Sequence, residues 1–474
     1  MRNVNIDAGI EQTGAHRFMG WLLVVAFAGL LFAHPGLYSR TGLYALLVGA
    51  IGLSWLLLLV RRRQWVEFAL PRELAWPVAV VLLSAGLSLL VNVDADWRAL
   101  WLLGSQLLFL WVGWWLARCS STVRLLGGAI VIGGAVAGLY AWCQFLRLDP
   151  LPTSTPFGEL RIVSFFANPN HLGNFLACAM PLALAGWLEA VADRPYAGRS
   201  ARFQPIVLYI LIGLIYGGGL LSASRGAWVA GLVGCLIVGG GHVWEVIRGR
   251  TKLHLLPLLG LFSLLVGITA LLSQRPVVRD PQKAVSMSER ILSSRHIVQP
   301  YSTLDSSLTA APGDSILVHD NAINHRYFIW QVTLDMIRSH PFTGLGYGSY
   351  QKRFARFRDA KQEEERFKTL NRVAQSEATP YAHNEYLHIW AESGILGLLG
   401  FLGLVAAILR QIMLGIWKGS RGIIYLWAAL GVLAVMLIHS LVSYPLHLPL
   451  NGSIFWVLSG IIFGWDSGND KLSL

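Results

Sequence analysis

Apolar runs of about twenty residues recur along this 474-residue chain from Phe18 to Trp465, and they constrain its fold more than any other feature. A lipid bilayer offers no hydrogen-bond partners to backbone N–H and C=O groups, so such a segment crosses it as a helix. The sequence therefore predicts an all-α, polytopic transmembrane helix bundle with about 12 spans. These spans are expected near residues 18–33, 42–60, 76–91, 99–117, 124–146, 172–190, 204–222, 227–246, 253–273, 387–409, 422–443 and 448–465.

The composition agrees with a continuous membrane domain. Hydrophobic residues make up 54% of the chain and charged residues 14%, whereas a typical soluble domain carries about 25% charged residues. Only the segment Gln274 to Tyr386 is both long and polar. We therefore expect transmembrane helices 1 to 9 in residues 1–273, a large extracytoplasmic loop with interfacial helices in 274–386, and helices 10 to 12 with a short cytoplasmic tail in 387–474.

The positions of the 38 Lys and Arg residues predict the orientation of the chain. With the N-terminus inside, eighteen of them lie in the cytoplasmic segments, five in the opposite short connections and fifteen in the long loop. Basic residues concentrate on the cytoplasmic side of membrane proteins. We therefore expect both termini in the cytoplasm and the long loop outside. The same distribution accounts for the net charge of +12, so no nucleic acid partner is expected.

Two arginines stand at the expected outer mouth of the bundle. Arg161 precedes the sequence Asn168-Pro-Asn170, which predicts a turn leading into a helix. Arg225 lies where one span ends and the next begins. An arginine presents a planar fork of donors that fits phosphate oxygens, and it keeps its charge when partly desolvated. The pair is a candidate diphosphate site, although either residue alone is more often a solvated side chain at a helix end.

Histidines mark the same outer face. His383 and Asn384 end the long loop, directly before the tenth expected span. A histidine there is suited to act as a general base, because its ordinary pKa lies near neutral pH. His439 and His447 reach the same face from the last two spans and are second candidates for this role.

Other patterns indicate neither a cofactor nor a metal site. The run Gly344-Leu-Gly346-Tyr-Gly348 follows no strand, so it predicts a turn that ends an interfacial helix rather than a dinucleotide-binding loop. The four cysteines lack the spacing of metal ligands or of a disulfide framework. Asp94 and Asp96 lie in a short outer loop, where two carboxylates are usually solvated.

Several segments, taken in order, resemble the O-antigen ligase and polymerase superfamily, which also includes bacterial protein O-oligosaccharyltransferases. These segments are Arg161 to Asn170, Ser224-Arg225-Gly226-Ala-Trp228, Arg326-Tyr-Phe-Ile-Trp330, His340 to Gly348, and His383-Asn384 followed by Glu392-Ser-Gly394. The resemblance covers about residues 155–460, while the first five spans match only in hydropathy.

The resemblance implies a metal-independent glycosyltransferase without a cofactor in the bacterial inner membrane. It would transfer a glycan from an undecaprenyl-diphosphate carrier to an acceptor hydroxyl of lipid A core or of a growing polysaccharide, on the periplasmic side. His383 matches the catalytic histidine, and Arg161 and Arg225 would hold the diphosphate. Supporting candidates are Asn168, Asn170, Arg326, Asn384, His439 and His447.

Departures from the family pattern leave the acceptor open, with a protein as a further alternative. The Ser-rich stretch 286–315 and the charged stretch 352–372 depart from the simplest pattern. Ser443 stands where polymerases and protein-glycosylating members are expected to carry an acidic residue, which argues against a polymerase. Two rival functions are a metal-dependent lipid-linked glycosyltransferase that uses Asp94 and Asp96, and a membrane transporter. A transporter is disfavoured by the long outer loop.

Overall fold

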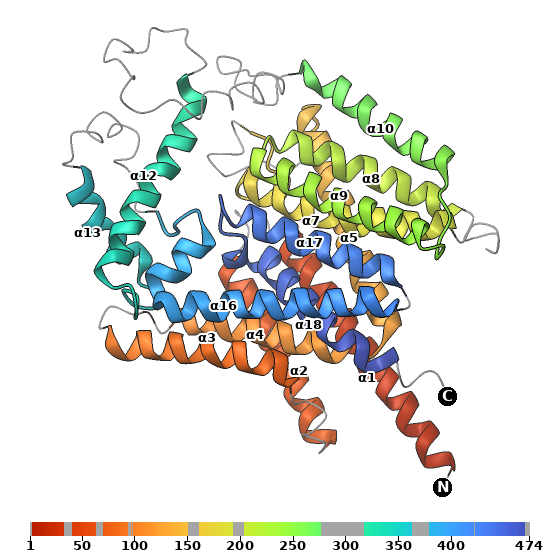
Figure 1. Cartoon of the computed structure of the whole chain (residues 1–474), viewed down its shortest axis with the longest axis horizontal. Coiled ribbons are helices and arrows are strands. Elements are labelled where there is room, and N and C mark those ends of the chain that lie inside the picture. Colours follow the sequence, from red (N-terminus) through yellow and green to blue (C-terminus); the bar gives the residue numbers. More distant parts are fainter. Residues whose placement is uncertain are drawn as a thin grey trace.

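The computed structural model describes residues 2–32, 40–62, 70–92, 96, 98–149, 161–192, 203–275, 317–362, 379–420 and 422–469. These residues form helices joined by turns (Figure 1). The helices are α1 (Arg2–Phe32), α2 (Arg40–Arg62), α3 (Arg72–Val91), α4 (Arg98–Leu116), α5 (Ser120–Phe145), α7 (Pro169–Ala192), α8 (Gln204–Leu221), α9 (Arg225–Ile247), α10 (Leu255–Ser273), α12 (Leu317–Ser339), α13 (Tyr350–Gln362), α16 (Glu385–Lys418), α17 (Ile423–His439), the 3-10 turn η7 (Pro445–His447) and α18 (Pro449–Asn469).

The predicted helix bundle is confirmed. Among the described residues, nine helices are long and apolar enough to cross a membrane, and three shorter apolar helices lie at Leu43–Leu58, Ile423–His439 and Pro449–Trp465. Two boundaries differ from the predicted spans. Helix α16 continues to Lys418 rather than 409, and α17 ends at His439 rather than 443, because residues 440–443 turn toward the beginning of α16.

The bundle is held together by pairs of helices that are distant in sequence. Helix α18 packs on α4, α17 on α7 and α9, α16 on α3, and α5 on α7 and α8, while α10 lies at the edge against α8 (Figure 1). The α4–α18 pair shows why glycine is needed at such contacts. A Cβ atom at Gly460 would lie 2.0 Å from the carbonyl oxygen of Leu110, and one at Gly113 would lie 2.2 Å from that of Val457. Small residues of this kind let membrane helices approach closely.

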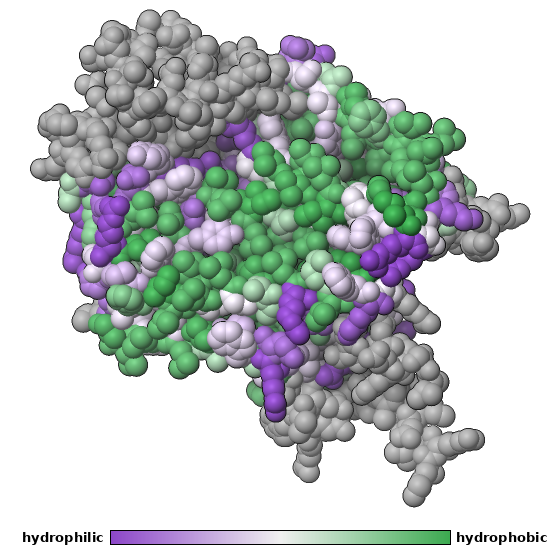
Figure 2. All heavy atoms as spheres, in the orientation of Figure 1, coloured by the Kyte–Doolittle hydropathy of each residue, from purple (hydrophilic) through white to green (hydrophobic). Residues whose placement is uncertain are grey.

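The outer surface is that of a lipid-facing bundle. Large apolar side chains are exposed along the helices, among them Leu83, Leu90 and Leu256, of which 72%, 88% and 82% is accessible. Figure 2 shows hydrophobic side chains across the middle of one face and hydrophilic side chains toward its margins. Water would disfavour so large an apolar area, whereas lipid tails would cover it.

Helices α12 and α13 belong to the polar segment between α10 and α16, and they pack against the first part of α16. Phe328, Val332 and Met336 of α12 form a small core with Tyr350 and Phe354 of α13. Between the two helices the chain turns through three glycines with positive φ, at positions 344, 346 and 348. The turn predicted at these glycines is therefore present, directly after α12. The Ser-rich stretch 286–315, Asp94 and residues 363–372 of the charged stretch lie outside the described residues.

Helix α1 begins and α18 ends at the end of the bundle that lies away from α12 and α13 (Figure 1). The predicted topology requires such an arrangement, because it puts both termini on one side and the long loop on the other. Which of these sides faces the cytoplasm stays a prediction.

Helix α16 is interrupted at Gly394, and this break separates the His383 region from the long apolar helix. Gly394 has φ 69° and ψ −175°. A Cβ atom there would lie 2.0 Å from the carbonyl oxygen of Phe342, in the turn after α12. We expect Gly394→Ala to lower the free energy of unfolding by about 2 to 5 kcal/mol, because it adds both backbone strain and an overlap with another backbone.

The measurement for this variant is the thermal unfolding midpoint of the purified protein in detergent. Gly403→Ala, in the same helix, is the matched control, because its nearest atom would be the Cβ of Pro77 at 3.9 Å. We expect the control to unfold at or slightly above the wild-type temperature. Equal midpoints for the two variants would contradict the strained contact.

Candidate functional site

The start of α7 packs directly against the junction between α8 and α9. A Cβ atom at Gly173 would lie 2.9 Å from side-chain atoms of Ser222, Ser224 and Ala227, so glycine is what allows this contact. The hydroxyl of Ser224 donates a hydrogen bond to the Oδ1 atom of Asn170 at 2.9 Å. Two of the segments in the resemblance are thus in contact.

The predicted turn before α7 is present. The Oδ1 atom of Asn168 accepts a hydrogen bond from the backbone N–H of Asn170 at 2.8 Å, and the helix begins at Pro169. Proline suits a first helical position, because the N–H it lacks would have no partner inside the helix. Asn168 and Asn170 therefore fix the backbone here, one locally and the other through Ser224.

Arg161 binds the end of α8. Its Nη2 atom donates to the carbonyl oxygens of Ser222 and Ala223, at 3.0 Å each. The segment after Arg161 is held by Gln144 of α5, whose Oε1 atom accepts from the N–H of Ser164 at 2.8 Å. Ser164 and Ala223 both adopt positive φ, which is uncommon for residues other than glycine and concentrates at functional sites. The guanidinium is therefore placed beside the first turn of α9.

Arg225 begins α9, and Arg326 of α12 lies close enough to respond to its charge. Burial and the positive charge of Arg225 lower the pKa of Arg326, while Tyr444 has the opposite effect. Two guanidinium groups repel each other, so only the fold keeps them together, and an anion between them would be attracted by both. The structure thus adds Arg326, predicted only as a supporting residue, to the arginines of this end.

His383 lies on the turn before α16, with φ 52°. Burial, followed by the charges of Arg326, His325 and His171, lowers its pKa to about 3. The sequence suggested an ordinary value near neutral pH, but cationic neighbours and loss of water both disfavour the protonated imidazole. His383 is therefore neutral over the physiological pH range, and a neutral imidazole can accept a proton.

Tyr444 joins the histidines of this end. Its ring centroid lies 5.0 Å from that of His383, 5.6 Å from that of His171 and 4.4 Å from that of Tyr381. Burial, with a contribution from Tyr381, raises the pKa of Tyr444 to about 12. Its hydroxyl consequently stays protonated and can donate a hydrogen bond.

The three remaining predicted residues, His439, Asn384 and His447, each make different contacts. His439 is buried at the end of α17, and a Cβ atom at Gly226 would lie 3.4 Å from its ring, so it is next to the first turn of α9. Asn384 caps α16 by accepting from the N–H of Leu387 at 3.1 Å. His447 instead contacts Glu385, with Nδ1 and Oε2 at 2.8 Å.

The structure therefore brings Arg225, Arg326 and His383 into one electrostatic neighbourhood, with Arg161 and His439 each beside the start of α9. The catalytic and binding roles stay predictions. The sequence did not assign roles to five residues of this region, although all lie beside or within the quoted segments: His171, His325, Tyr381, Glu385 and Tyr444.

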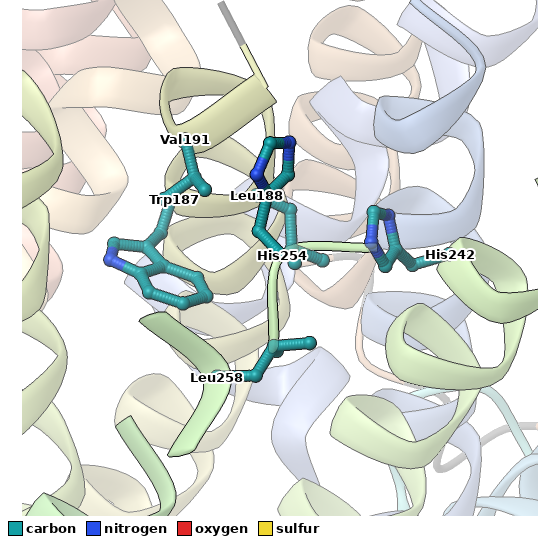
Figure 3. Close-up of a pocket in the computed structure, with 6 residues that line it drawn as sticks. All are labelled: Trp187, Leu188, Val191, His242, His254 and Leu258. Carbon is teal, nitrogen blue, oxygen red and sulfur yellow. The ribbon is translucent and has the colours of Figure 1, made fainter. Parts of the chain in front are cut away.

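A small pocket lies elsewhere. It is lined by Trp187, Leu188, Val191, His242, His254 and Leu258 (Figure 3). His242 is seventeen residues after Arg225 in the same helix, or about 25 Å along its axis at 1.5 Å per residue. The pocket therefore belongs to the opposite end of the bundle and not to the candidate site.

The metal-dependent alternative rests on Asp94 and Asp96. Within the described ranges, no three His, Cys, Asp or Glu side chains are grouped as a metal ion requires. Asp94 is not among the described residues, and the backbone N–H of Asp96 donates to the carbonyl of Tyr347 at 2.8 Å. In the part of the chain that the structure describes, Asp96 thus supports the glycine turn.

Part of the chain matches a known protein family. Residues 208–402 match the family described as O-antigen ligase, a narrower range than the resemblance over 155–460. The match includes Arg225, Arg326 and His383 but not Arg161. No curated protein matches the chain. The family implies glycosyltransferase activity of the O-antigen ligase or polymerase kind, which favours this class over a transporter. Residues 208–402 are therefore similar to the O-antigen ligase family, which supports the resemblance of the chain to the O-antigen ligase and polymerase superfamily.

Proposed function

We propose that this protein transfers a glycan from an undecaprenyl-diphosphate carrier to an acceptor hydroxyl, with His383 as the general base. The acceptor oxygen attacks the anomeric carbon of the donor, and the bond from that carbon to the diphosphate breaks. The diphosphate leaves with the bonding electrons, and the acceptor proton moves to His383. The reaction needs no redox cofactor, because no atom changes its oxidation state.

One observation supports this proposal: the charge of Arg326 acts on the imidazole of His383, and the charge of Arg225 acts on Arg326, at one end of the bundle. The leaving diphosphate gains negative charge as its bond breaks, and positively charged groups already in place stabilise that charge. Arg161, beside the first turn of α9, is the third arginine that we assign to the diphosphate.

Donor binding also changes the strength of the base. In the free protein, burial and the nearby cations lower the pKa of His383 to about 3, which makes it a weak base. A bound diphosphate opposes the charge of Arg326, and a negative charge close to an imidazole raises its pKa. His383 therefore becomes a stronger proton acceptor once the donor is bound. Because the pKa of His383 rises only after the donor binds, the imidazole is not protonated before the substrate arrives.

We propose that the site faces the periplasm and that both termini are cytoplasmic, on the distribution of eighteen basic residues against five. A reporter fused within residues 302–315 is expected to behave as extracytoplasmic, and one fused after residue 470 as cytoplasmic. Cytoplasmic behaviour of the first fusion would move the site away from a donor in the outer leaflet.

The function is tested with purified protein in lipid vesicles, supplied with a lipid-linked glycan donor and a candidate acceptor. Three acceptors are compared: lipid A core, a free glycan of the same repeat and an acceptor protein. We expect transfer to one of them, and we expect it to survive EDTA. Transfer that EDTA abolishes and Mg²⁺ or Mn²⁺ restores would instead support the metal-dependent alternative with Asp94 and Asp96. Failure of transfer to every acceptor, with donor bound, would contradict the proposed activity.

A further inference from the structure

The turn that carries His383 is tied to residues 440–448, which connect α17 to α18 and which we call the final outer loop. The Nδ2 atom of Asn384 donates to the carbonyl oxygen of Leu441 at 3.1 Å. The backbone N–H of Glu385 donates to the carbonyl oxygen of Ser440 at 2.9 Å. Both residues that follow His383 are therefore anchored to the same loop.

The side chain of Glu385 makes the connection tighter. Its Oε1 atom accepts from the N–H of Leu446 at 2.7 Å, and its Oε2 atom lies 2.8 Å from Nδ1 of His447. The carboxylate is fully buried, whereas 19% of the His447 side chain is accessible. A buried carboxylate without these donors would be left without water or protein partners, so the contacts resist separation.

The pairing with Glu385 favours the protonated form of His447. Burial alone would lower its pKa, but the charges of Glu385 and Glu392 and the hydrogen bond to Glu385 outweigh burial and raise it. The ring of His447 also meets the rings of His388 and Tyr381, with centroids 4.6 and 5.0 Å away. The pair is thus packed on several sides.

The backbone conformation of His383 needs the contacts that Asn384 and Glu385 make with the final outer loop. A φ of 52° places this residue in the left-handed region, which is disfavoured for a residue with a Cβ atom. A strained conformation persists only where surrounding contacts impose it. The contacts that impose it here come from the two following residues.

We propose that Glu385 is a positioning residue, which clamps the strained turn to the final outer loop and so orients His383 toward the reacting groups. This inference rests on the proposed function of His383. Glu385 itself touches no reacting atom, and it acts through the imidazole two residues before it.

A purely structural role would lower the amount of active protein equally at every pH, whereas a positioning role predicts a change in the pH profile. The groups that face His383 are Arg326 and His325 of α12, His171 of α7 and Tyr444 of the final outer loop. Burial of the turn and the positive charges of Arg326, His325 and His171 lower the pKa of His383 and so keep its imidazole neutral in mild acid. A turn released from the final outer loop becomes more hydrated, so protonation of His383 should begin at a higher pH.

The experiment compares the full-length wild type, Glu385→Gln and Glu245→Gln in the reconstituted transfer assay. Glutamine keeps the acceptor for the N–H of Leu446 but removes the charge that pairs with His447. Glu245 is the matched control, because it is also buried and paired with a cation, Arg250 at 3.2 Å, at the far end of α9. For Glu385→Gln we expect unchanged donor binding, a kcat lower by about ten- to a hundredfold, and an acid limb of kcat/KM displaced toward neutral pH. The control should follow the wild type.

Wild-type kcat in Glu385→Gln, or a loss by the same factor at every pH, would overturn the positioning role. If Glu385→Gln does not fold, His447→Gln breaks the pair from the other side and should displace the acid limb in the same direction.

His383→Ala distinguishes failure of the positioning role from failure of the proposed base. If it is inactive while Glu385→Gln behaves as wild type, only the positioning role is wrong. If His383→Ala transfers normally, the proposed base is wrong, and the positioning role fails with it.

Discussion

Replacement of His383 by alanine is expected to lower transfer by about 100-fold to 10,000-fold, while the lipid-linked donor still binds. The loss has the size typical of a missing general base, because the acceptor hydroxyl then keeps its proton as it attacks. Donor binding should persist, since Arg161, Arg225 and Arg326 are untouched. The measurement pairs the transfer rate of purified, folded protein with an equilibrium binding assay for the donor.

The pH dependence gives a second, independent check of the same residue. Burial and the neighbouring cations lower the pKa of His383 to about 3 in the free protein, so its protonated form is absent near neutral pH. Wild-type kcat/KM should therefore not fall as the pH drops through the ordinary histidine value near 6.5. The transfer rate of His383→Ala is compared with that of His439→Ala, because His439 is another histidine at this end of the bundle, beside Gly226. Retained transfer in His383→Ala, with transfer lost in His439→Ala or His447→Ala, would move the base to one of those residues.

The second large effect is expected at Arg225. Loss of one charge-assisted contact to the diphosphate costs about 1.5 to 3 kcal/mol, or roughly one to two decades in rate or affinity. Arg225→Ala should therefore reduce kcat/KM for the donor by about 10- to 100-fold. Arg225→Lys should restore only part of the activity, because an ammonium group lacks the planar fork of donors. Arg161→Ala should lose transfer as well, and it also removes two hydrogen bonds to the end of α8.

Arg338→Ala is the matched control for the arginine variants. Arg338 lies on α12, as Arg326 does, but 70% of its side chain is exposed and it pairs with Asp335 at 2.8 Å. A solvated ion pair of this kind contributes little. We expect the control to transfer within about twofold of the wild-type rate, since that pair is worth well under 1 kcal/mol. Wild-type kinetics in both Arg225→Ala and Arg161→Ala would mean that these arginines are ordinary charges at helix ends.

Local features of the candidate site could be predicted from the sequence. The turn before α7 follows from Asn168 and Pro169, whose side chain and ring favour that backbone wherever it lies. The position of Arg225 at a helix start follows from the end of one apolar run and the start of another. The glycine turn after α12 follows from three residues that tolerate positive φ. In each case the responsible interactions connect residues that are neighbours in the chain.

The final arrangement of charges depends on contacts between distant segments. By itself the sequence determined the set of apolar helices, because a bilayer demands a fixed length of apolar chain from every span. Only the tertiary structure determined that Arg326, from the polar segment, meets Arg225, and that Glu385 pairs with His447, 62 positions away. Those contacts depend on how α12, α16 and α17 pack at one end of the bundle. Packing energy arises between two helices, so it cannot be deduced from the sequence of one segment alone.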